Sequence, residues 1–397
     1  MGATAPIFLF LTLQKVHNIS MKNYSSHIAI IGAGISGLTL GCVLKQSGMP
    51  VIIFEKSSTA SEQGAGISIS PNGLRVIRNI GIENELRSES GNPKEVQFFY
   101  NQNKLTSFPV DIVTTSRQCL YKNLLNKYLS MDGEILFDHE VSNINLIDPS
   151  ISFSNGSSFN VNHIAACDGI KSKCRSLIYK DAEQPAYSGY SVWRGILEKN
   201  QTENHIHLGP NFHIVTYPID NNRTSFVAAV KNPKETKESW KTKGTYEDLC
   251  HDLPESTRHI YESLQDSNEI YKWGVYTKKI PDHLFDNNIT FLGDAAHPMV
   301  PFLGQGGCMA LEDAYIFGKL IKLNADMQKS QKMYQKLRYN RVNKIYKDSA
   351  LQGKLNHISN PLIVYCRNFL MKYTPVAALK PNSIWGYDPD VEIKKIS

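Results

Sequence analysis

Three glycines near the start of the chain, Gly32, Gly34 and Gly37, have the spacing of a phosphate-binding turn. They lie between the β-branched run His27–Ile31 and an apolar helical pattern over Leu38–Lys45. The first glycine would permit the tight turn, the second would let a phosphate approach the backbone, and the third would allow the helix to pack closely on the strand. Because a helix start offers unsatisfied N–H groups and a partial positive charge, the pattern predicts a bound pyrophosphate.

A carboxylate follows the next predicted strand. Val51–Phe54 is apolar, and Glu55 comes directly after it. At that place a carboxylate can accept both hydroxyls of an adenosine ribose, and it disfavours the 2′-phosphate of NADP. Strand, turn, helix, strand and acid together predict a dinucleotide site, although these residues alone do not separate NAD from FAD.

A second anion site is predicted near residue 300. Gly293-Asp294 follows the strand-like run Ile289–Leu292, where a carboxylate can bind the hydroxyls of a polyol. Gly304–Gly307 leads into the helical pattern Met309–Leu320, whose start presents N–H groups to an anion. Reduced flavin is anionic at N1–C2=O, so this helix start favours a flavin. An ordinary strand–loop–helix connection is the alternative.

These motifs, in this order, resemble the class A flavoprotein monooxygenases typified by p-hydroxybenzoate hydroxylase, and most closely their salicylate hydroxylase-like branch. The resemblance runs from about His27 to Asp388. It includes Gly64-Ala65-Gly66-Ile67 with Pro71-Asn72-Gly73, Arg117-Gln118-Cys119-Leu120, Asp168-Gly169, Tyr217-Pro218 and Trp385-Gly386-Tyr387-Asp388. It implies non-covalent FAD at Gly32, Ala33, Gly34, Ser36, Gly37, Glu55, Lys56, Gly66, Ile67, Arg117, Val141, Asp168, Asp294, Gly304, Gln305, Gly306 and Gly307.

The resemblance also implies a reaction. NADH or NADPH would reduce FAD, O2 would then give a C4a-hydroperoxide, and one oxygen atom would enter an electron-rich ring. A base that deprotonates a phenol would help, and His213 and Tyr217, four residues apart on a strand-like segment, are the candidates. Packed structural roles for both are the alternative. Arg194 could bind a substrate carboxylate or form a surface salt bridge, while Pro301 and Phe302 would line the substrate.

Two departures from relatives bear on the substrate. Enzymes acting on quinone precursors usually carry Gly-x-Asn where this chain has Gly307-Cys308-Met309, and urate hydroxylases carry Asp in place of Phe302. The resemblance therefore favours a small phenolic or benzoate-like substrate. A ubiquinone-pathway hydroxylase or an epoxidase of a lipid-like substrate is the alternative, and a non-catalytic flavin-binding scaffold is a more remote one.

The elements that must position these residues indicate an α/β fold in two parts. We expect a discontinuous Rossmann-like FAD-binding domain (21–93, 110–180 and 285–350), an inserted antiparallel sheet domain that binds substrate (94–109 and 181–284), and a C-terminal helical segment (351–397). The strand-like runs of the inserted domain are Val96–Tyr100, Ser188–Ile196, His205–Leu208, Phe212–Pro218 and Ser225–Val230.

Composition limits the remaining function classes. The net charge of +6 is spread along the chain without a dense basic stripe, so nucleic acid is not expected as a partner. The seven cysteines are scattered and lack metal-ligand spacing, which predicts a reducing, cytoplasmic location and no metal site. We expect a monomer or a homodimer.

Two apolar segments need separate treatment. Pro6–Leu13 is too short to span a bilayer and lacks the basic start of a signal peptide, so residues 1–20 are expected to be an extension before Met21. Leu362–Met371 is also apolar, but Arg367 interrupts it. A packed helix is expected there rather than a transmembrane segment, and a peripheral membrane contact stays open.

Overall fold

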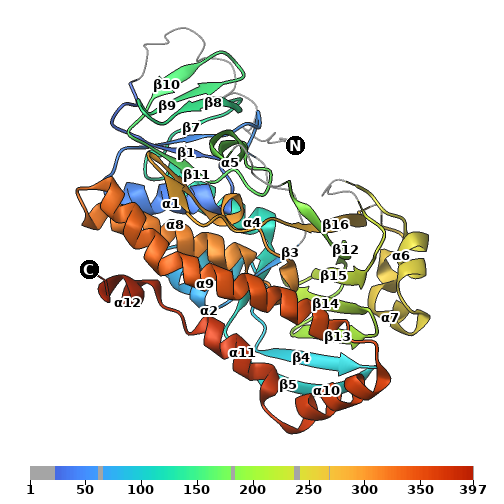
Figure 1. Ribbon diagram of the computed structural model, residues 1–397. Coiled ribbons are helices and arrows are strands. Elements are labelled where there is room, and N and C mark those ends of the chain that lie inside the picture. Colours follow the sequence, from blue (N-terminus) through green and yellow to red (C-terminus); the bar gives the residue numbers. More distant parts are fainter. Residues whose placement is uncertain (1–22, 61–65, 180–183, 237–241, 268, 397) are drawn as a thin grey trace, which may run out of the picture.

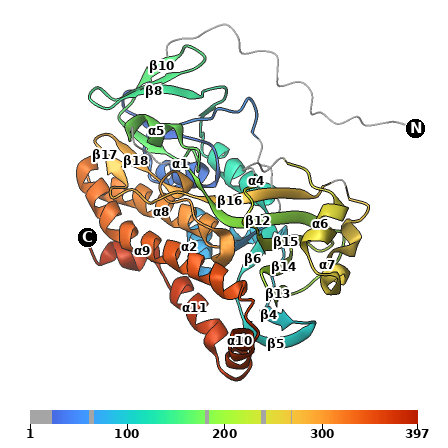
Figure 2. The same cartoon turned by 45° about the vertical axis from the view of Figure 1, so that its right-hand side comes forward.

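The computed structural model describes residues 23–60, 66–179, 184–236, 242–267 and 269–396 (Figure 1). The expected extension at 1–20 and the residues Gly64 and Ala65 lie outside this description. Two large sheets dominate the fold, and helices from the second half of the chain pack along both of them (Figures 1 and 2).

The first large sheet is mainly parallel, with strand order β17-β18-β11-β1-β2-β7. Its strands are β1 (Ile28–Ile31), β2 (Val51–Phe54), β7 (Ile135–Leu136), β11 (His163–Ala166), β18 (Ile289–Phe291) and the antiparallel edge strand β17 (Phe285–Asp286). The central strands are buried along their whole length, as continuous apolar runs in parallel sheets usually are.

Both faces of this parallel sheet are covered. Helices α1 (Ile35–Gln46) and α8 (Gly306–Leu323) lie on one face, and α4 (Arg117–Leu129) packs against α1. The small sheet of β8 (Val141–Asn145), β9 (Ser150–Phe153) and β10 (Ser158–Asn160) lies on the other face (Figure 1). There the rings of Phe153 and Phe159 contact Phe54 of β2, which joins the two sheets through a common core.

The second large sheet has seven strands in the order β16-β12-β15-β14-β13-β4-β5. They are β4 (Glu95–Tyr100), β5 (Asn103–Pro109), β12 (Ala186–Leu197), β13 (Asn204–Gly209), β14 (Phe212–Pro218), β15 (Thr224–Lys231) and β16 (Tyr271–Thr277). All neighbouring pairs are antiparallel except β13 with β4. One face packs its own core, around Trp193 and Phe226, against α6 (Tyr246–Asp252), η1 (Glu255–Thr257), α7 (Arg258–Tyr261) and η2 (Glu262–Leu264).

The remaining elements connect the two sheets. Strands β3 (Gly66–Ile69) and β6 (Val113–Ser116) form a two-stranded ladder. Helices α2 (Pro71–Ile80) and α3 (Glu83–Ser88) follow β3 in the chain, and α4 follows β6. The others are α5 (Lys173–Ile178), η3 (Gly293–Ala295), η4 (Pro301–Leu303), α9 (Met327–Asn356), α10 (Pro361–Tyr373), α11 (Val376–Trp385) and α12 (Pro389–Lys394). Helix α9 runs through the boundary expected at 350/351, because its helical pattern continues without a break to Asn356.

The predicted α/β class, with a Rossmann-like part, an inserted antiparallel sheet and C-terminal helices, is confirmed. The segment Leu362–Met371 is helical, as expected. Only part of its apolar surface is packed: Val364 and Met371 are buried, whereas Leu362, Phe369 and Leu370 are exposed. Among the described residues, no helix is long and apolar enough to cross a membrane.

Candidate flavin and substrate site

The turn between β1 and α1 has the geometry of a phosphate site. Gly32 has φ +102°, and a Cβ there would lie 2.6 Å from the carbonyl oxygen of Cys167. A Cβ on Gly37 would lie 1.9 Å from the carbonyl oxygen of Gly32, so neither position accepts a side chain. A Cβ on Gly34 would instead meet no protein atom within 4 Å. Gly34 is the N-cap residue of α1, and no side chain accepts hydrogen bonds from the first N–H groups of the helix. The helix start therefore has N–H groups available for a ligand.

Glu55 is held in place by the same turn. Its Oε2 accepts a hydrogen bond from the backbone N–H of Ala33 at 2.8 Å, and its Oε1 accepts one from Ser57 N–H at 2.9 Å. The carboxylate is half-buried and keeps lone pairs for the hydroxyls of a ribose. Of the neighbouring predicted residues, Lys56 is exposed and Val141 is buried at the start of β8.

Two buried polar atoms beside this turn, Ser36 Oγ and Asp168 Oδ1, have no hydrogen-bond partner among the residues that the structure describes. The other carboxylate oxygen of Asp168, Oδ2, accepts from Cys174 N–H at 3.0 Å, which fixes the orientation of the group. Buried polar atoms are nearly always hydrogen-bonded, so unpartnered ones beside an open glycine turn fit a site for a polar ligand.

Asp294 and Arg117 continue the site toward its other end. Asp294 lies in η3 and is solvent-accessible, yet the surrounding protein raises the pKa of its carboxyl, while His297 and Arg117 act in the opposite direction. That combination is expected for a carboxylate in an open but deep cleft. Arg117 begins α4, directly after Ser116, which is paired with Gly66 across the β3–β6 ladder. Because Arg117 affects the pKa of Asp294, its guanidinium lies near the Asp294 carboxylate.

The start of α8 is open like the start of α1. Cβ atoms on Gly304 and Gly306 would meet no protein atom within 4 Å, whereas one on Gly307 would lie 2.7 Å from Ile67 Cδ1. The side chain of Gln305 is turned into the protein, where its Nε2 donates to Ser70 Oγ at 2.9 Å and its Oε1 accepts from Asn72 at 3.0 Å. Gln305 can therefore contact a ligand here only through its backbone.

A buried ionic network fixes the segment Gly293–His297 that follows β18. Asp313 Oδ2 accepts from Gly293 N–H at 2.9 Å and from His297 Nε2 at 2.5 Å, and Oδ1 accepts from Arg338 Nε at 2.6 Å. Arg338 and Arg341 both pair with Glu312. Burial alone would raise the pKa of Asp313, but His297 and Arg338 outweigh it and lower the pKa to about 2. His297 is thus a structural partner of the loop.

The sequence analysis did not identify this network. The signal that could have found it is the adjacent pair Glu312-Asp313 within an otherwise apolar helix, since buried acids need partners.

His213 and Tyr217 share one face of β14, but they contact different surroundings. Four strand residues separate them by about 13 Å. His213 packs against the rings of Phe302 and His357, with centroids 5.6 and 4.8 Å away. Tyr217 lies under Gly66, where an added Cβ would come 2.4 Å from the tyrosine ring. One small substrate therefore cannot use both groups at the same atom.

His213 is a weak candidate for a base. Its Nδ1 lies 3.2 Å from His357 Nε2, and His357 Nδ1 lies 2.6 Å from the carbonyl oxygen of Gly353. Burial, and secondly the His357 ring, hold the pKa of His213 well below its usual value. The imidazole is therefore neutral at physiological pH and is suited to hydrogen bonding rather than to holding a proton. His357, 144 residues away in the chain, was not predicted.

Arg194 and the η4 residues complete the substrate side. Arg194 stacks over the ring of Trp273 at 5.0 Å, and burial lowers the pKa of its guanidinium to about 10. The Tyr217 hydroxyl is close enough to Arg194 to raise the pKa of the guanidinium, against the effect of burial. Arg194 is half-buried on β12. Pro301 is exposed and Phe302 is half-buried against Tyr190 and His213, which makes η4 an apolar edge of the sheet face.

The residues fit FAD. The α1 turn offers a phosphate cradle with a ribose carboxylate, Arg117 lies near enough to Asp294 to affect its pKa, and the α8 start is open at Gly304 and Gly306. Among the described residues, no group of three or more His, Cys, Asp or Glu side chains is arranged to hold a metal ion.

The sequence pattern of the family described as FAD binding domain matches residues 25–346. The chain belongs to this family. It is similar to the 3-amino-4-hydroxybenzoate 2-monooxygenase PtnB3 of Streptomyces platensis, with 24% identity over 369 residues, 85% of this chain and 91% of the relative. It is also similar to the aurachin C monooxygenase/isomerase of Stigmatella aurantiaca, with 26% identity over 363 residues, 87% of this chain and 93% of the relative.

Solved structures show the same fold. The structure of Klebsiella pneumoniae HpxO complexed with FAD and uric acid has a TM-score of 0.80, with 22% identity, and the match covers 91% of this chain and 96% of that one. The predictions of the family, of FAD as the cofactor and of an FAD-dependent monooxygenase are confirmed.

Proposed function

We propose that this flavin monooxygenase uses NADH or NADPH and O2 to hydroxylate a small phenolic or benzoate-like ring. The observation that carries the proposal is a chain of contacts through β3: the α8 start lies against Ile67, and the neighbouring Gly66 lies against Tyr217 of the substrate sheet. The same sheet carries an aromatic edge at Phe302 and a cation at Arg194. A flat apolar ring with an anionic group matches that surface.

FAD, when bound, supplies O2 activation and the transfer of one oxygen atom. The residues of this chain bind, orient and exclude water. Gly32–Gly37 and Glu55 would hold the ADP part, Asp294 the ribitol, and the N–H groups of Gly306 and Gly307 the anionic edge of the ring system. Arg194 would hold the substrate carboxylate or phenolate, and Phe302 would keep the ring dry.

On the substrate side, His213 and Tyr217 are the two groups that could hydrogen-bond a substrate oxygen. The neutral imidazole of His213 would accept or donate one hydrogen bond, with its other nitrogen held by His357. Burial raises the pKa of Tyr217, although Arg194 acts against this, so its phenol would stay protonated and could donate a hydrogen bond to a substrate oxygen. Either bond would orient a phenol without itself removing the proton.

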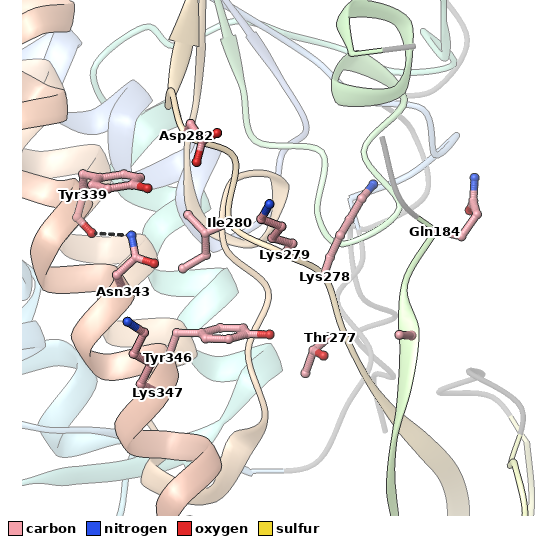
Figure 3. Close-up of a pocket in the computed structure, with 11 residues that line it drawn as sticks. Gln184, Thr277, Lys278, Lys279, Ile280, Asp282, Tyr339, Asn343, Tyr346 and Lys347 are labelled. Atoms are coloured by element: carbon pink, nitrogen blue, oxygen red, sulfur yellow. Dashed lines mark hydrogen bonds between the residues drawn. The ribbon is translucent and has the colours of Figure 1, made fainter. Parts of the chain in front are cut away.

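A basic pocket is the candidate docking place for the phosphates of NAD(P)H. It has a volume of about 390 Å³ and is lined by Lys278, Lys279 and Lys347 together with Asp282 and Tyr346 (Figure 3). Arg175 of α5 links this pocket to the segment after η3, because its guanidinium donates to the carbonyl oxygens of Lys279 at 2.5 Å and Ala296 at 3.1 Å. The lysines supply positive charge for a diphosphate.

The proposal places the enzyme in the cytoplasm, as a monomer or a homodimer. All seven thiols are free, which fits a reducing compartment.

A lipid-like substrate is the second candidate. The outward apolar side chains of α10 favour it, because such a surface suits contact with lipid. Both candidates use the same flavin site and differ in the size of ring substituent that the sheet face must accept.

The test is oxidation of NADH and NADPH by the purified flavoprotein against a panel of phenols, benzoates and prenylated quinones or quinolones. We expect one compound class to stimulate oxidation at least ~10-fold, and Phe302→Ala to change which compounds do so. Asp266→Asn, at an exposed position in the loop after η2, is the matched control. No stimulation by any class, with FAD bound, would contradict the proposal.

A further inference from the structure

Helix α10 is amphipathic in the reverse sense for a helix on a globular domain. The positions that face the protein are Val364, Arg367, Asn368 and Met371, two of them polar. The guanidinium of Arg367 donates inward, to the carbonyl oxygen of Leu355 at 3.1 Å and to the side chain of Asn368. The solvent-facing side carries Leu362 (71% exposed), Ile363, Tyr365 (69%), Cys366, Phe369, Leu370 and Tyr373 (64%).

The apolar surface extends to both neighbouring helices. The last turns of α9 add Leu351 and Leu355, and α11 adds Val376 and Leu379. Ten of the fourteen large apolar side chains that are exposed in the described part of the chain therefore lie between residues 351 and 379, which makes this one contiguous segment rather than scattered surface residues. Figures 1 and 2 show α10 at the outer edge of the molecule, beside β5.

The charge of this segment has one sign. Residues 349–387 contain Lys354, Arg367, Lys372 and Lys380 and neither Asp nor Glu. Lys354 and Lys372 are exposed next to the apolar side chains. An apolar face bordered by basic residues, on a helix too short to span a bilayer, is the pattern of a helix that lies in the headgroup region of an anionic membrane.

We propose that the surface formed by α10, the end of α9 and the start of α11 binds peripherally to anionic phospholipid membranes. A second copy of the chain is a poorer occupant, because two such faces would bring their lysines together without acids to pair them. On the inner side, Ala377, Ala378 and Trp385 of α11 pack near Phe108 and Ile206 of the substrate sheet. Docking would therefore place that sheet close to the bilayer.

Vesicle co-sedimentation of the FAD-loaded protein tests this proposal. Vesicles of phosphatidylcholine alone are compared with vesicles containing about one third phosphatidylglycerol, at low salt and at 0.5 M NaCl. We expect binding to the anionic vesicles that weakens several-fold at high salt, because screening removes the electrostatic part. The triple variant Leu362→Ser, Phe369→Ser, Leu370→Ser should lower the partition coefficient at least ~10-fold, because it removes apolar surface.

The matched control replaces exposed apolar residues elsewhere, Leu129→Ser, Ile147→Ser and Leu323→Ser, and should bind like the wild type. Equal far-UV spectra and FAD content confirm that each variant is folded. Absence of wild-type binding to anionic vesicles, or binding that the triple variant retains, overturns the proposal. A wild-type dimer that the triple variant converts to monomer, without vesicle binding, would overturn it in favour of a second copy. Turnover is not measured, so the outcome does not depend on the proposed reaction.

Discussion

Replacing Gly34 by alanine should separate FAD binding from folding. The residue has φ −77° and ψ −171°, which alanine adopts without strain, and the new methyl group would meet no protein atom within 4 Å. The unfolded chain loses some entropy, and the helix cap becomes slightly poorer, so the stability of the protein without FAD should change by less than about 1 kcal/mol.

The effect on FAD should be large. If the pyrophosphate lies against Gly34, the methyl group displaces it from the N–H groups of the α1 start. Losing one hydrogen bond to a charged group costs about 1.5–3 kcal/mol. We therefore expect FAD affinity to fall by ~10–100-fold, which corresponds to about 1.4–2.7 kcal/mol.

The assay titrates FAD into the stripped protein, follows the change in flavin fluorescence, and records thermal unfolding without FAD. Gly37→Ala is the comparison variant, because its Cβ would collide with Gly32 at 1.9 Å and should destabilise even the FAD-free protein. Undiminished FAD affinity in Gly34→Ala would refute the placement of the pyrophosphate. Strong destabilisation of the FAD-free Gly34→Ala protein would refute the open space at this turn.

Three further predictions follow from the buried titratable groups. Asp313→Asn removes the acid that binds Gly293, His297 and Arg338, so the free energy of unfolding in urea should fall by about 2–3 kcal/mol, whereas the exposed control Asp266→Asn should leave it unchanged. Burial lowers the pKa of His163 to about 3, below its unfolded value, so its contribution is complete above about pH 6.5 and declines as pH falls toward 3. The wild type should therefore lose about 2 kcal/mol more than His163→Asn between pH 7 and pH 5, and equal losses would contradict the burial argument. His213→Asn should leave the pH dependence of kcat between pH 6 and 8 unchanged, because the pKa of His213 lies well below that window; disappearance of an acid limb would instead identify His213 as the base.

Local sequence patterns predicted the flavin-binding frame well. Strand–turn–helix units form the α1 turn with Glu55, and the segment from Asp294 to the α8 start. Because the residues of each unit are close in sequence, a short sequence pattern is enough to predict it. Strand β14 occupies Phe212–Pro218, as its pattern predicted.

Interactions between distant residues were harder to predict. His213 meets His357 across 144 residues, and Asp313 meets Arg338 across 25. A local pattern can show that Asp313 needs a partner, but in neither pair does it identify the partner residue. Helix α4 was not among the elements predicted for the stretch 110–180. The orientation of α10 was not predicted, since an apolar run shows that a helix has an apolar face but not which way that face points.

The most direct test of the proposed function is turnover under ¹⁸O2 with NADH or NADPH and the compound that best stimulates oxidation. The account predicts a product heavier by one ¹⁸O atom, formed in proportion to the nicotinamide oxidised, and none without FAD. Oxidation that yields only hydrogen peroxide with every compound class, or a product whose oxygen comes from water, would contradict it.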